Sequence, residues 1–466
     1  MISNNQQLIQ THKPKSLVNR CGYRLDDVMG NNRLDMAKLL VGTEGTLGII
    51  TEATIRTSRL PKHSGLILLA CERLENAANA AQLIRKYDIA ACDLMDRRLL
   101  QLACESDERY NHVLPKTAEA ILLVEKTGES FAEVREGLQQ IAKQTRQKKL
   151  AFDSKIALEH DDVELLCRLT HRVVPTLYRL KGSTRPLPFV EDIAIPPDEL
   201  PSFLVRVQNV LKKHQVTASL FAHAAHGQLH IRPFLDLADP EHVRRMQHLA
   251  RDLYAEVLDV KGTISGEHAD GLSRTWFVRE QYGPLYDVFV QLKQLFDPQN
   301  RLNPGKIIDE SGQSLAQNLR PVQIMTSQTE LSDSSEPDAL IEENETPPSK
   351  PIVQLELNWT PDDMTLAARS CNGCGGCRTT SDIERMCPMF RIAPAEEATP
   401  RAKANLMRAI MTGRLDPEVL GSDAISDIAD LCFHCHQCRV ECPASVDIPK
   451  LVTECKCRSM WRKGLP

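Results

Sequence analysis

The sequence predicts an α+β domain followed by a smaller, mainly α-helical metal-binding domain. Three observations support this class. Strand-like and helix-like segments alternate up to about residue 310, a polar stretch separates two parts of the chain, and eight of the fifteen cysteines crowd into residues 371–442. At 466 residues the chain is long enough for two or three domains with a sizeable core.

Alternating strand and helix patterns fill the first part. The apolar segments at residues 65–74, 118–128 and 217–227 are typical of strands, while the apolar spacing at residues 76–87 and 130–147 is helical. A sheet and helices that alternate along the chain must bury their apolar faces against each other. We therefore expect helices packed on a sheet.

Residues 311–350 predict a disordered linker. They are rich in Ser, Glu, Gln and Pro and poor in aromatic residues, so they cannot bury enough apolar surface to become ordered. Beyond the linker, residues 399–413 and the tail from Val446 have helical patterns and flank the cysteine groups. The second part is therefore predicted to be helical around its metal sites.

Charge and hydropathy favour action on small molecules. The chain has 57 basic and 62 acidic residues and a net charge of −5, which offers no general attraction for nucleic acid or an anionic membrane. Residues 1–16 lack the apolar core of a secretion signal, and no window approaches the roughly 20 apolar residues of a membrane span. The sequence predicts a cytoplasmic protein with no nucleic-acid partner and no transmembrane segment.

Two cysteine groups are the most specific motif. Residues 371–388 read CNGCGGCRTTSDIERMCP, and residues 432–443 read CFHCHQCRVECP. The second run has the spacing that holds cubane iron–sulfur clusters in bacterial ferredoxins, where the fourth cysteine of a run ligates the other cluster. A pair of zinc knuckles is the alternative, because CxxC pairs also bind zinc. We expect two 4Fe-4S clusters, one on Cys371, Cys374, Cys377 and Cys442, the other on Cys432, Cys435, Cys438 and Cys387.

The remaining cysteines carry no such spacing. Five of them lie among apolar residues and are predicted to be buried thiols: Cys21, Cys71, Cys92, Cys104 and Cys167. The sequence assigns no role to Cys455 and Cys457.

Three histidines fall within residues 221–233, FAHAAHGQLHIRP. If the flanking segments form an antiparallel hairpin, His223 and His230 can face each other across the two strands and grip a metal, while His226 in the turn points elsewhere. A surface hairpin with hydrogen-bonded histidines is the alternative. A second polar segment, GTISGEHADGLSR, sets Glu267 beside His268 in a Gly-rich loop. This pair could supply a third ligand and a free base, leaving open positions on the metal for a substrate.

Together these motifs resemble the FAD-linked oxidases of the vanillyl-alcohol-oxidase type, in their D-2-hydroxyacid dehydrogenase branch. The matching stretches are a flavin-binding strand and loop (residues 39–56, LLVGTEGTLGIITEATIR), the metal-ligand hairpin (221–230), a Glu-His catalytic loop (265–274) and a closing flavin contact (296–307, FDPQNRLNPGKI). The linked cysteine domain is similar to that of long bacterial members acting on D-2-hydroxyglutarate or D-lactate.

The resemblance implies a domain organisation. Residues 1–60 would be the C-terminal remnant of an FAD-binding domain, and residues 61–310 a ferredoxin-like α+β domain of the kind found at the C-terminus of FAD-linked oxidases. The linker would follow at residues 311–350, and a mainly α-helical double-cubane domain at residues 351–466.

The resemblance also implies site residues. A divalent metal, with zinc the expected ion, would be held by His223, His230 and Glu267, and His268 would remove the substrate's hydroxyl proton. FAD would contact Glu44, Gly45, Thr46, Gly48 and Asn303. The substrate's carboxylates would bind Arg172, Thr176 and Arg185, with Lys181 as another candidate.

The implied reaction is FAD-dependent oxidation of a D-2-hydroxyacid to the 2-oxoacid, with electrons passing through both clusters to a quinone or a carrier protein. D-2-hydroxyglutarate, D-lactate and glycolate stay open as substrates. An electron-transfer iron–sulfur subunit and an inactive fragment of a split flavoenzyme are the alternatives, although an intact Glu267–His268 loop beside spaced histidines argues against decay.

Two departures from the family pattern stand out. Residues 225–228 read AHGQ where the family has Gly-Asp-Gly-Asn, which leaves the spacing of the outer histidines unchanged. Residues 1–38 contain no Gly-rich loop to cradle the FAD pyrophosphate. A separate upstream FAD-domain polypeptide is therefore a candidate partner.

Overall fold

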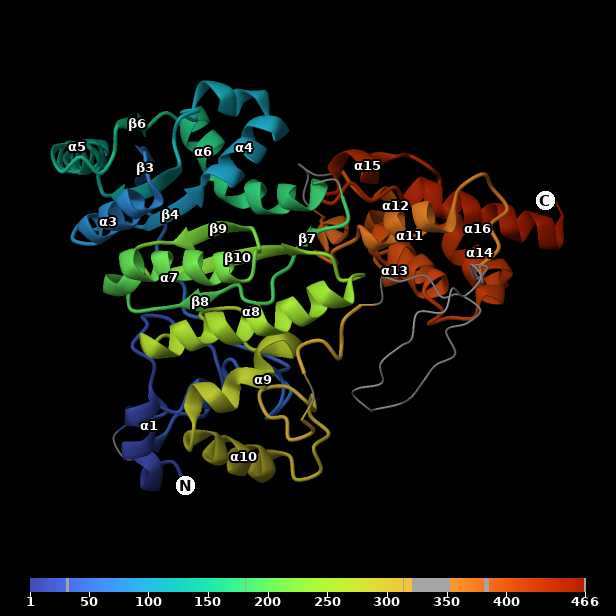
Figure 1. Cartoon of the computed structure of the whole chain (residues 1–466), viewed down its shortest axis with the longest axis horizontal. Helices are drawn as coiled ribbons and strands as arrows, with labels where there is room; N and C mark the ends of the chain where they lie inside the picture. The colour runs from blue at the N-terminus through green and yellow to red at the C-terminus, as the bar shows by residue number, and fades with distance from the viewer. Residues whose placement is uncertain (31–32, 181, 313, 321–352, 381–384, 465–466) are drawn as a thin grey trace. The chain divides into compact units, whose positions relative to one another are not determined.

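The computed structural model describes residues 1–30, 33–180, 182–312, 314–320, 353–380 and 385–464, with the backbone alone for residues 171–175. These residues divide into two compact units, Met1–Leu177 with Gly182–Leu319, and Tyr178–Lys181 with Arg320–Pro466 (Figure 1). Most of the predicted linker lies outside the described residues. In the described part, no helix is long and apolar enough to cross a bilayer.

An antiparallel sheet forms the centre of the first unit. Within the described residues it has eight strands in the order β6-β3-β5-β4-β9-β10-β7, and β8 pairs with β10. The predicted strands at residues 65–74, 118–128 and 217–227 correspond to β3, β5 and β9, which confirms the α+β class. The strands are β3 (His63–Cys71), β4 (Ala91–Asp96), β5 (Ala120–Gly128), β6 (Asp153–Ala157), β7 (Arg185–Pro186), β8 (Ile193–Ala194), β9 (Ala218–His223) and β10 (Gln228–Leu235).

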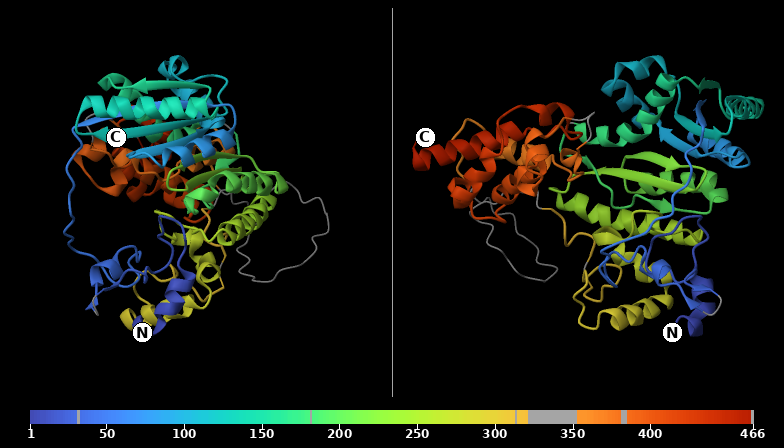
Figure 2. Two further views of the ribbon diagram at one scale, coloured as in Figure 1. Left: turned by 90° about the vertical axis from the view of Figure 1, so that its left-hand side faces the viewer. Right: turned by 180° about the vertical axis from the view of Figure 1, so that it is seen from behind.

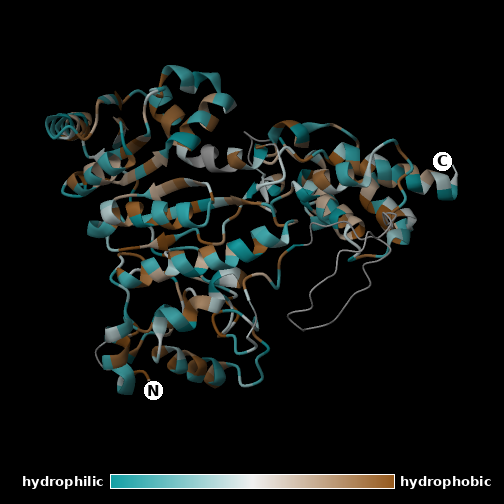
Figure 3. Ribbon diagram, viewed as in Figure 1, coloured by the Kyte–Doolittle hydropathy of each residue, from teal (hydrophilic) through white to brown (hydrophobic). Residues whose placement is uncertain are grey.

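Helices cover both faces of this sheet. Alternate side chains of β3 point to opposite faces, so Ile67 and Leu69 join the core cluster under α3 and α5, whereas Leu66 and Leu68 are buried on the other side. Apolar colouring of the strands and the inward helix faces shows the same layering (Figure 3). The covering helices are α3 (Leu74–Ile84), α4 (Arg97–Ser106), α5 (Phe131–Gln147), α6 (His160–Thr176), α7 (Leu200–Lys213) and α8 (Pro240–Asp259), joined by short turns η2 (Glu108–His112), η3 (Leu177–Arg179) and η4 (Pro197–Glu199).

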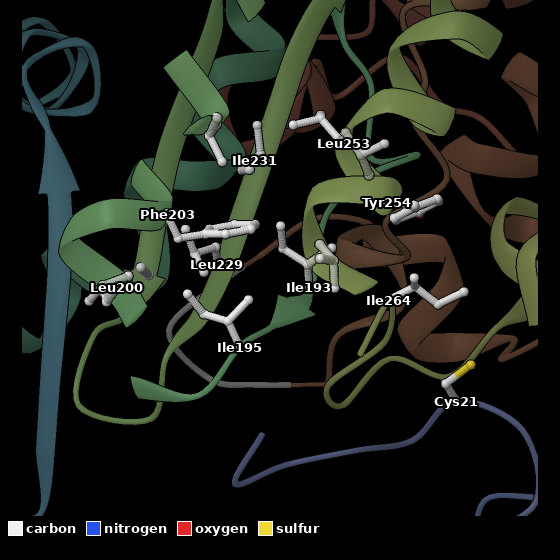
Figure 4. Packing of buried hydrophobic residues seen from close by; sticks show 14 of the residues in the cluster. Cys21, Ile193, Ile195, Leu200, Phe203, Leu229, Ile231, Leu253, Tyr254 and Ile264 are labelled. Carbon is white, nitrogen blue, oxygen red and sulfur yellow. The ribbon is translucent and has the colours of Figure 1, made fainter. Parts of the chain in front are cut away.

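Strand β10 separates core residues from polar ones. Leu229 and Ile231 pack with Phe203 of α7 and Tyr254 of α8 (Figure 4). Because side chains alternate along a strand, His230 and its polar neighbours two residues away point to the opposite face. The apolar side chains of β10 thus pack in the core, and its polar side chains are available to form a site on the other face.

The N-terminal residues pack against the last two helices of the first unit, α9 and α10. The Tyr282 hydroxyl donates to the Cys21 carbonyl at 2.7 Å, and the Tyr23 ring lies edge-on to Phe289 with centroids 5.5 Å apart. Helices α1 and α10 lie side by side (Figure 2). The elements of this region are η1 (Ser3–Asn5), α1 (Gln6–His12), β1 (Met29–Gly30), β2 (Arg33–Leu34), α2 (Met36–Leu40), α9 (Gly271–Tyr282) and α10 (Leu285–Phe296).

The described residues of the second unit are mainly helical, as predicted. Helix α13 begins where Thr399 accepts a hydrogen bond from the Ala402 amide at 3.0 Å and Pro400 occupies the first turn. Helices α11 and α16 pack on α13. The elements are α11 (Pro361–Arg369), η5 (Gly376–Arg378), α12 (Pro388–Ile392), η6 (Glu396–Ala398), α13 (Pro400–Met411), η7 (Pro417–Gly421), α14 (Asp423–Asp430), α15 (Gln437–Glu441) and α16 (Ile448–Lys463).

Gly227 closes the β9–β10 hairpin, and its replacement tests this packing. Its φ is +72°, and a Cβ atom there would collide with the Ile195 carbonyl oxygen. We expect Gly227→Ala to destabilise the first unit by about 3 kcal/mol, because strain and steric overlap add. Gly305→Ala is the matched control, with φ +73° and open space around the added Cβ, and should cost about 1 kcal/mol. Equal urea midpoints for the two variants would contradict the packing described.

Candidate active site and cluster pockets

The hairpin forms, but its register differs from the prediction. His223 pairs with Gln228, and His230 pairs with Phe221. His223 and His230 are therefore diagonal neighbours on one face of the sheet, and the expectation that they face each other directly was wrong. The reason is that the turn consists of residues 224–227 only. Gly227, with a positive φ, ends the turn, so the first residue pair of the hairpin is His223 with Gln228. The two rings still meet, with centroids 5.3 Å apart, and His226 is exposed in the turn.

Asp93 of β4 orients His223. The two residues are paired across β4 and β9, and His223 Nδ1 lies 2.7 Å from Asp93 Oδ1. This hydrogen bond raises the pKa of His223, with a further contribution from the charge of Glu267. Since the carboxylate takes Nδ1, the Nε2 nitrogen of His223 is left for another ligand.

Glu191 is the centre of the site, although the sequence analysis did not select it. Its buried carboxylate lies 2.7 Å from His268 Nδ1, 3.5 Å from His230 Nδ1 and 3.0 Å from Arg232 Nη2. Burial alone would raise the pKa of Glu191, but the bonds to His230 and His268 and the charge of Arg232 hold this pKa well below its usual range. A signal was present: an acidic pair, Glu191 and Asp192, stands inside the apolar run LPFVEDIAIPP.

Three imidazoles therefore come together, with the ring of His230 nearly perpendicular to that of His223 and tilted by 34° from that of His268. The ring centroids of His230 and His268 are 5.4 Å apart, so His230 lies between His223 and His268. Each Nδ1 faces a carboxylate, which is how metal-ligating histidines are usually held. Within the described residues, Glu191, His230 and His268 are the group of three whose donor atoms lie within 4.8 Å of one another, so they offer a cation a set of ligands. The predicted set of His223, His230 and Glu267 is not brought together in this way. The donor chemistry fits a divalent ion such as zinc.

Asp192 holds the loop that carries Glu267 and His268. It is fully buried with φ +67°, and its carboxylate accepts the amide N–H of Glu267 at 3.0 Å and of His268 at 2.7 Å. The Ser265 hydroxyl donates to the same carboxylate at 3.2 Å. The loop backbone is thus held against Asp192, while the Glu267 side chain is exposed.

Glu44 joins the predicted flavin segment to this loop. Its carboxylate accepts the amide N–H of Asp270 at 2.9 Å and of Gly271 at 3.0 Å, where α9 begins. Its carbonyl oxygen accepts from Asn303 Nδ2 at 2.6 Å. Glu44, a predicted FAD contact, is therefore hydrogen-bonded to the loop of residues 265–274, and Asn303 is bonded to Glu44.

The other predicted FAD contacts surround Glu44. Thr46 is fully buried, and its hydroxyl bonds to Tyr23, so it can meet a ligand through its backbone only. Its carbonyl oxygen accepts from Lys293 at 2.8 Å. Gly45 has φ +72°, and a Cβ atom there would have almost no neighbours, so a ligand could approach its backbone closely. Gly48 is half-buried.

The predicted substrate-binding residues are only partly described. The side chain of Arg172, and Lys181 as a whole, lie outside the described residues. Thr176, at the end of α6, is half-buried, and Arg185 of β7 pairs with Leu235 of β10. Arg232, which the sequence analysis did not select, shares the face of β10 that presents His230.

Two cysteine-lined pockets occupy the second unit. One, here the Cys387 pocket, is lined by Cys387, Cys432, Cys435 and Cys438. The other, the Cys371 pocket, is lined by Cys371, Cys374, Cys377 and Cys442, with Cys438 at the shared wall. Each pocket thus takes three cysteines from one run and one from the other run, and four thiols fit one cubane cluster.

The seven other cysteines lie apart from these pockets. Cys21, Cys71 and Cys92 are buried, whereas Cys104 and Cys167 are half-buried. In α16, Cys455 is buried and Cys457 is half-buried. Burial raises the pKa of Cys455 to about 12, which makes it an unreactive thiol.

Comparison with known proteins decides the family. Residues 60–307, more than half of the chain, match the family model described as FAD linked oxidases, C-terminal domain. The chain belongs to the FAD-linked oxidase family. Residues 370–447 of this FAD-linked oxidase chain match a family model described as a 4Fe-4S dicluster domain. This match implies iron–sulfur clusters in the domain that contains the two cysteine pockets.

Curated relatives extend along nearly the whole chain. A D-2-hydroxyglutarate dehydrogenase of Pseudomonas putida is 28% identical over 95% of this chain and 46% of its own length. Glycolate oxidase subunit GlcD of Bacillus subtilis is 28% identical over 62% of this chain and 60% of its own length. The solved 4-ethylphenol oxidase of Gulosibacter chungangensis aligns with a TM-score of 0.40 and 13% identity, over 53% of this chain and 54% of that one. The FAD-linked oxidase chain spans about half the length of the first of these relatives.

Asp192 gives a test of the loop geometry. In Asp192→Asn, an amide N–H would point at backbone N–H donors, and we expect a loss of about 3 kcal/mol because a buried hydrogen-bonded charge is removed. Protease cleavage at residues 265–270 should rise with it. Asp198→Asn, an exposed carboxylate paired with Arg85, is the control and should cost less than about 1 kcal/mol. If Asp192→Asn left the free energy of unfolding unchanged, the loop would be held by other contacts.

Proposed function

We propose that the chain takes part in FAD-dependent oxidation of a D-2-hydroxyacid, D-2-hydroxyglutarate or D-lactate, to the 2-oxoacid. The electrons leave through two 4Fe-4S clusters to a quinone or a carrier protein. The observation that carries this proposal is the convergence of His223, His230 and His268, each held through Nδ1 by a carboxylate. The names of the relatives, D-2-hydroxyglutarate dehydrogenase and glycolate oxidase, support the hydroxyacid class.

His223, His230 and Glu267 are the proposed metal ligands. The Nε2 atoms of the two histidines are free to bind because Asp93 and Glu191 take the Nδ1 atoms. Glu267, which is exposed in the loop beside His268, is the proposed third ligand. These residues would hold a divalent cation, with zinc the expected ion, and the cation would lower the pKa of a substrate hydroxyl.

His268 is the proposed base. Its Nδ1 lies against Glu191 Oε1 at 2.7 Å, so Nε2 receives the hydroxyl proton. The hydrogen bond to Glu191 raises the pKa of His268, and the carboxylate stabilises the imidazolium that forms. The substrate's carboxylates are proposed to bind Arg172, Thr176 and Arg185.

When bound, FAD would supply a hydride acceptor for the substrate's α-carbon, and the clusters would supply one-electron acceptors. The chain's proposed contribution to the FAD site is the backbone of residues 44–48 with Asn303. Residues 49–62 are exposed throughout and include Ile49, Ile55 at 82% exposure and Leu60 at 91% exposure. Such an apolar segment marks a binding surface, and the proposed partner is a polypeptide that supplies the pyrophosphate-binding part of the FAD domain.

The histidines can be separated by their roles. In a preparation containing FAD, His223→Ala and His230→Ala should lose the divalent metal and activity, because a site that loses one of three ligands seldom keeps its ion. His268→Ala should keep the metal and lose 10² to 10⁴ in turnover, roughly the contribution of a general base. Metal analysis and dye-linked oxidation of D-2-hydroxyglutarate are the measurements.

His226→Ala, in the exposed turn, is the matched control and should keep metal and activity. Loss of the metal from His268→Ala, with retention in His223→Ala, would instead assign the ion to Glu191, His230 and His268.

The exposed segment can be tested by FAD retention. The chain alone should retain little FAD, and co-purification with the partner polypeptide should restore it. Ile55→Lys should weaken that complex by about 2 kcal/mol, roughly thirtyfold, because an apolar contact is replaced by a charge. Val205→Lys on α7, also exposed, is the control. Full FAD on the chain alone, or equal retention in both variants, would contradict the proposal.

The cluster assignment predicts crossed ligation. Anaerobically purified chain should contain about eight irons, from two cubane clusters. Cys442→Ser should damage the cluster of Cys371, Cys374 and Cys377, whose pocket it lines, more than the cluster of its sequence neighbours. Electron paramagnetic resonance of the two centres measures this. Zinc in place of iron, or damage to the Cys432 cluster alone, would refute the assignment.

A further inference from the structure

Helix α13 supplies one cation to each cluster pocket. Pro400 lines both pockets, Arg401 lines the Cys371 pocket, and Lys403 lines the Cys387 pocket. Residues two apart on a helix point in different directions, so one turn of α13 can serve both pockets.

The two cations differ in how their charge is balanced. Arg401 is paired with Glu396 by two bonds, Nε to Oε1 at 2.8 Å and Nη2 to Oε2 at 2.7 Å. Lys403 is 5% exposed, and its Nζ donates to the carbonyl oxygens of Glu397 at 2.8 Å and Ala398 at 2.9 Å. Within the part of the chain that the structure describes, Lys403 has no carboxylate partner in an ion pair.

A buried ammonium without a carboxylate is costly unless another negative charge lies near it. The charges that could compensate it are those of the cysteines, which would be thiolates as cluster ligands: burial lowers the pKa of Lys403, and the charges of Cys387 and Cys432 would oppose that shift. Both cysteines line the same pocket as Lys403. The counter-charge of this lysine is therefore the ligand set of the Cys387 pocket.

We propose that Lys403 raises the reduction potential of the cluster in the Cys387 pocket. Reduction adds one electron to the cluster and no bond is formed or broken, so the reduced state carries one more negative charge. A nearby buried positive charge stabilises that state, since net charge around a cluster sets its potential. In the protein the electron comes from reduced flavin. The inference rests on the proposed clusters and adds a residue that tunes one of them.

The test is a redox titration of the full chain, with dithionite as reductant and electron paramagnetic resonance as readout. Lys403→Gln keeps N–H donors for the two carbonyls and removes the charge, whereas Lys403→Arg keeps the charge. Lys463→Gln is the control. Lys463 lies at the end of α16, where it pairs with Asp423 and lines neither cysteine pocket, so this variant also removes one charge. The signal that Cys435→Ser alters identifies the Cys387 pocket, which Cys435 lines.

With eight irons present, Lys403→Gln should lower the ratio of reduced to oxidised cluster at the wild-type midpoint by about tenfold, a shift of about 59 mV. Lys403→Arg and Lys463→Gln should titrate as the wild type. Unchanged midpoints in an iron-replete Lys403→Gln would overturn the proposal. So would iron loss in Lys403→Gln with retention in Lys403→Arg, because the charge would then hold the cluster and not set its potential. Absence of iron from the wild type would instead refute the clusters themselves.

Discussion

The site depends on burying two consecutive carboxylates, Glu191 and Asp192. A buried charge is stable only when its oxygens are fully bonded. Glu191 meets this condition with His230, His268 and Arg232, and Asp192 with the amides of the loop that carries His268. The loop must therefore close over β10 for either charge to be buried, and this closure is what brings His268 to His223 and His230.

The same loop is hydrogen-bonded to the predicted flavin segment around Glu44. Glu44, far away in the sequence, caps the start of α9 with its carboxylate and receives Asn303 on its carbonyl oxygen. Stretches near residues 44, 268 and 303 thus form one hydrogen-bonded unit.

Local patterns predicted much of this fold and only part of its site. The cysteine spacing predicted the two groups because it is a local property, and apolar alternation identified β3, β5 and β9. Asp93 and Glu191 were missed because their partners are set by strand pairing and loop closure, which leave no periodic signal. The hairpin register was also wrong, since it depends on Gly227 fitting against Ile195.

The most direct test of the account is a crystal structure of the zinc-soaked chain with anomalous scattering at the zinc edge. The account predicts one peak about 2.0–2.1 Å from Nε2 of both His223 and His230, with the Glu267 carboxylate turned toward it. Asp93 should remain on Nδ1 of His223, and Glu191 on Nδ1 of His230. A peak bonded to the Glu191 carboxylate, with His223 unbound, would contradict it.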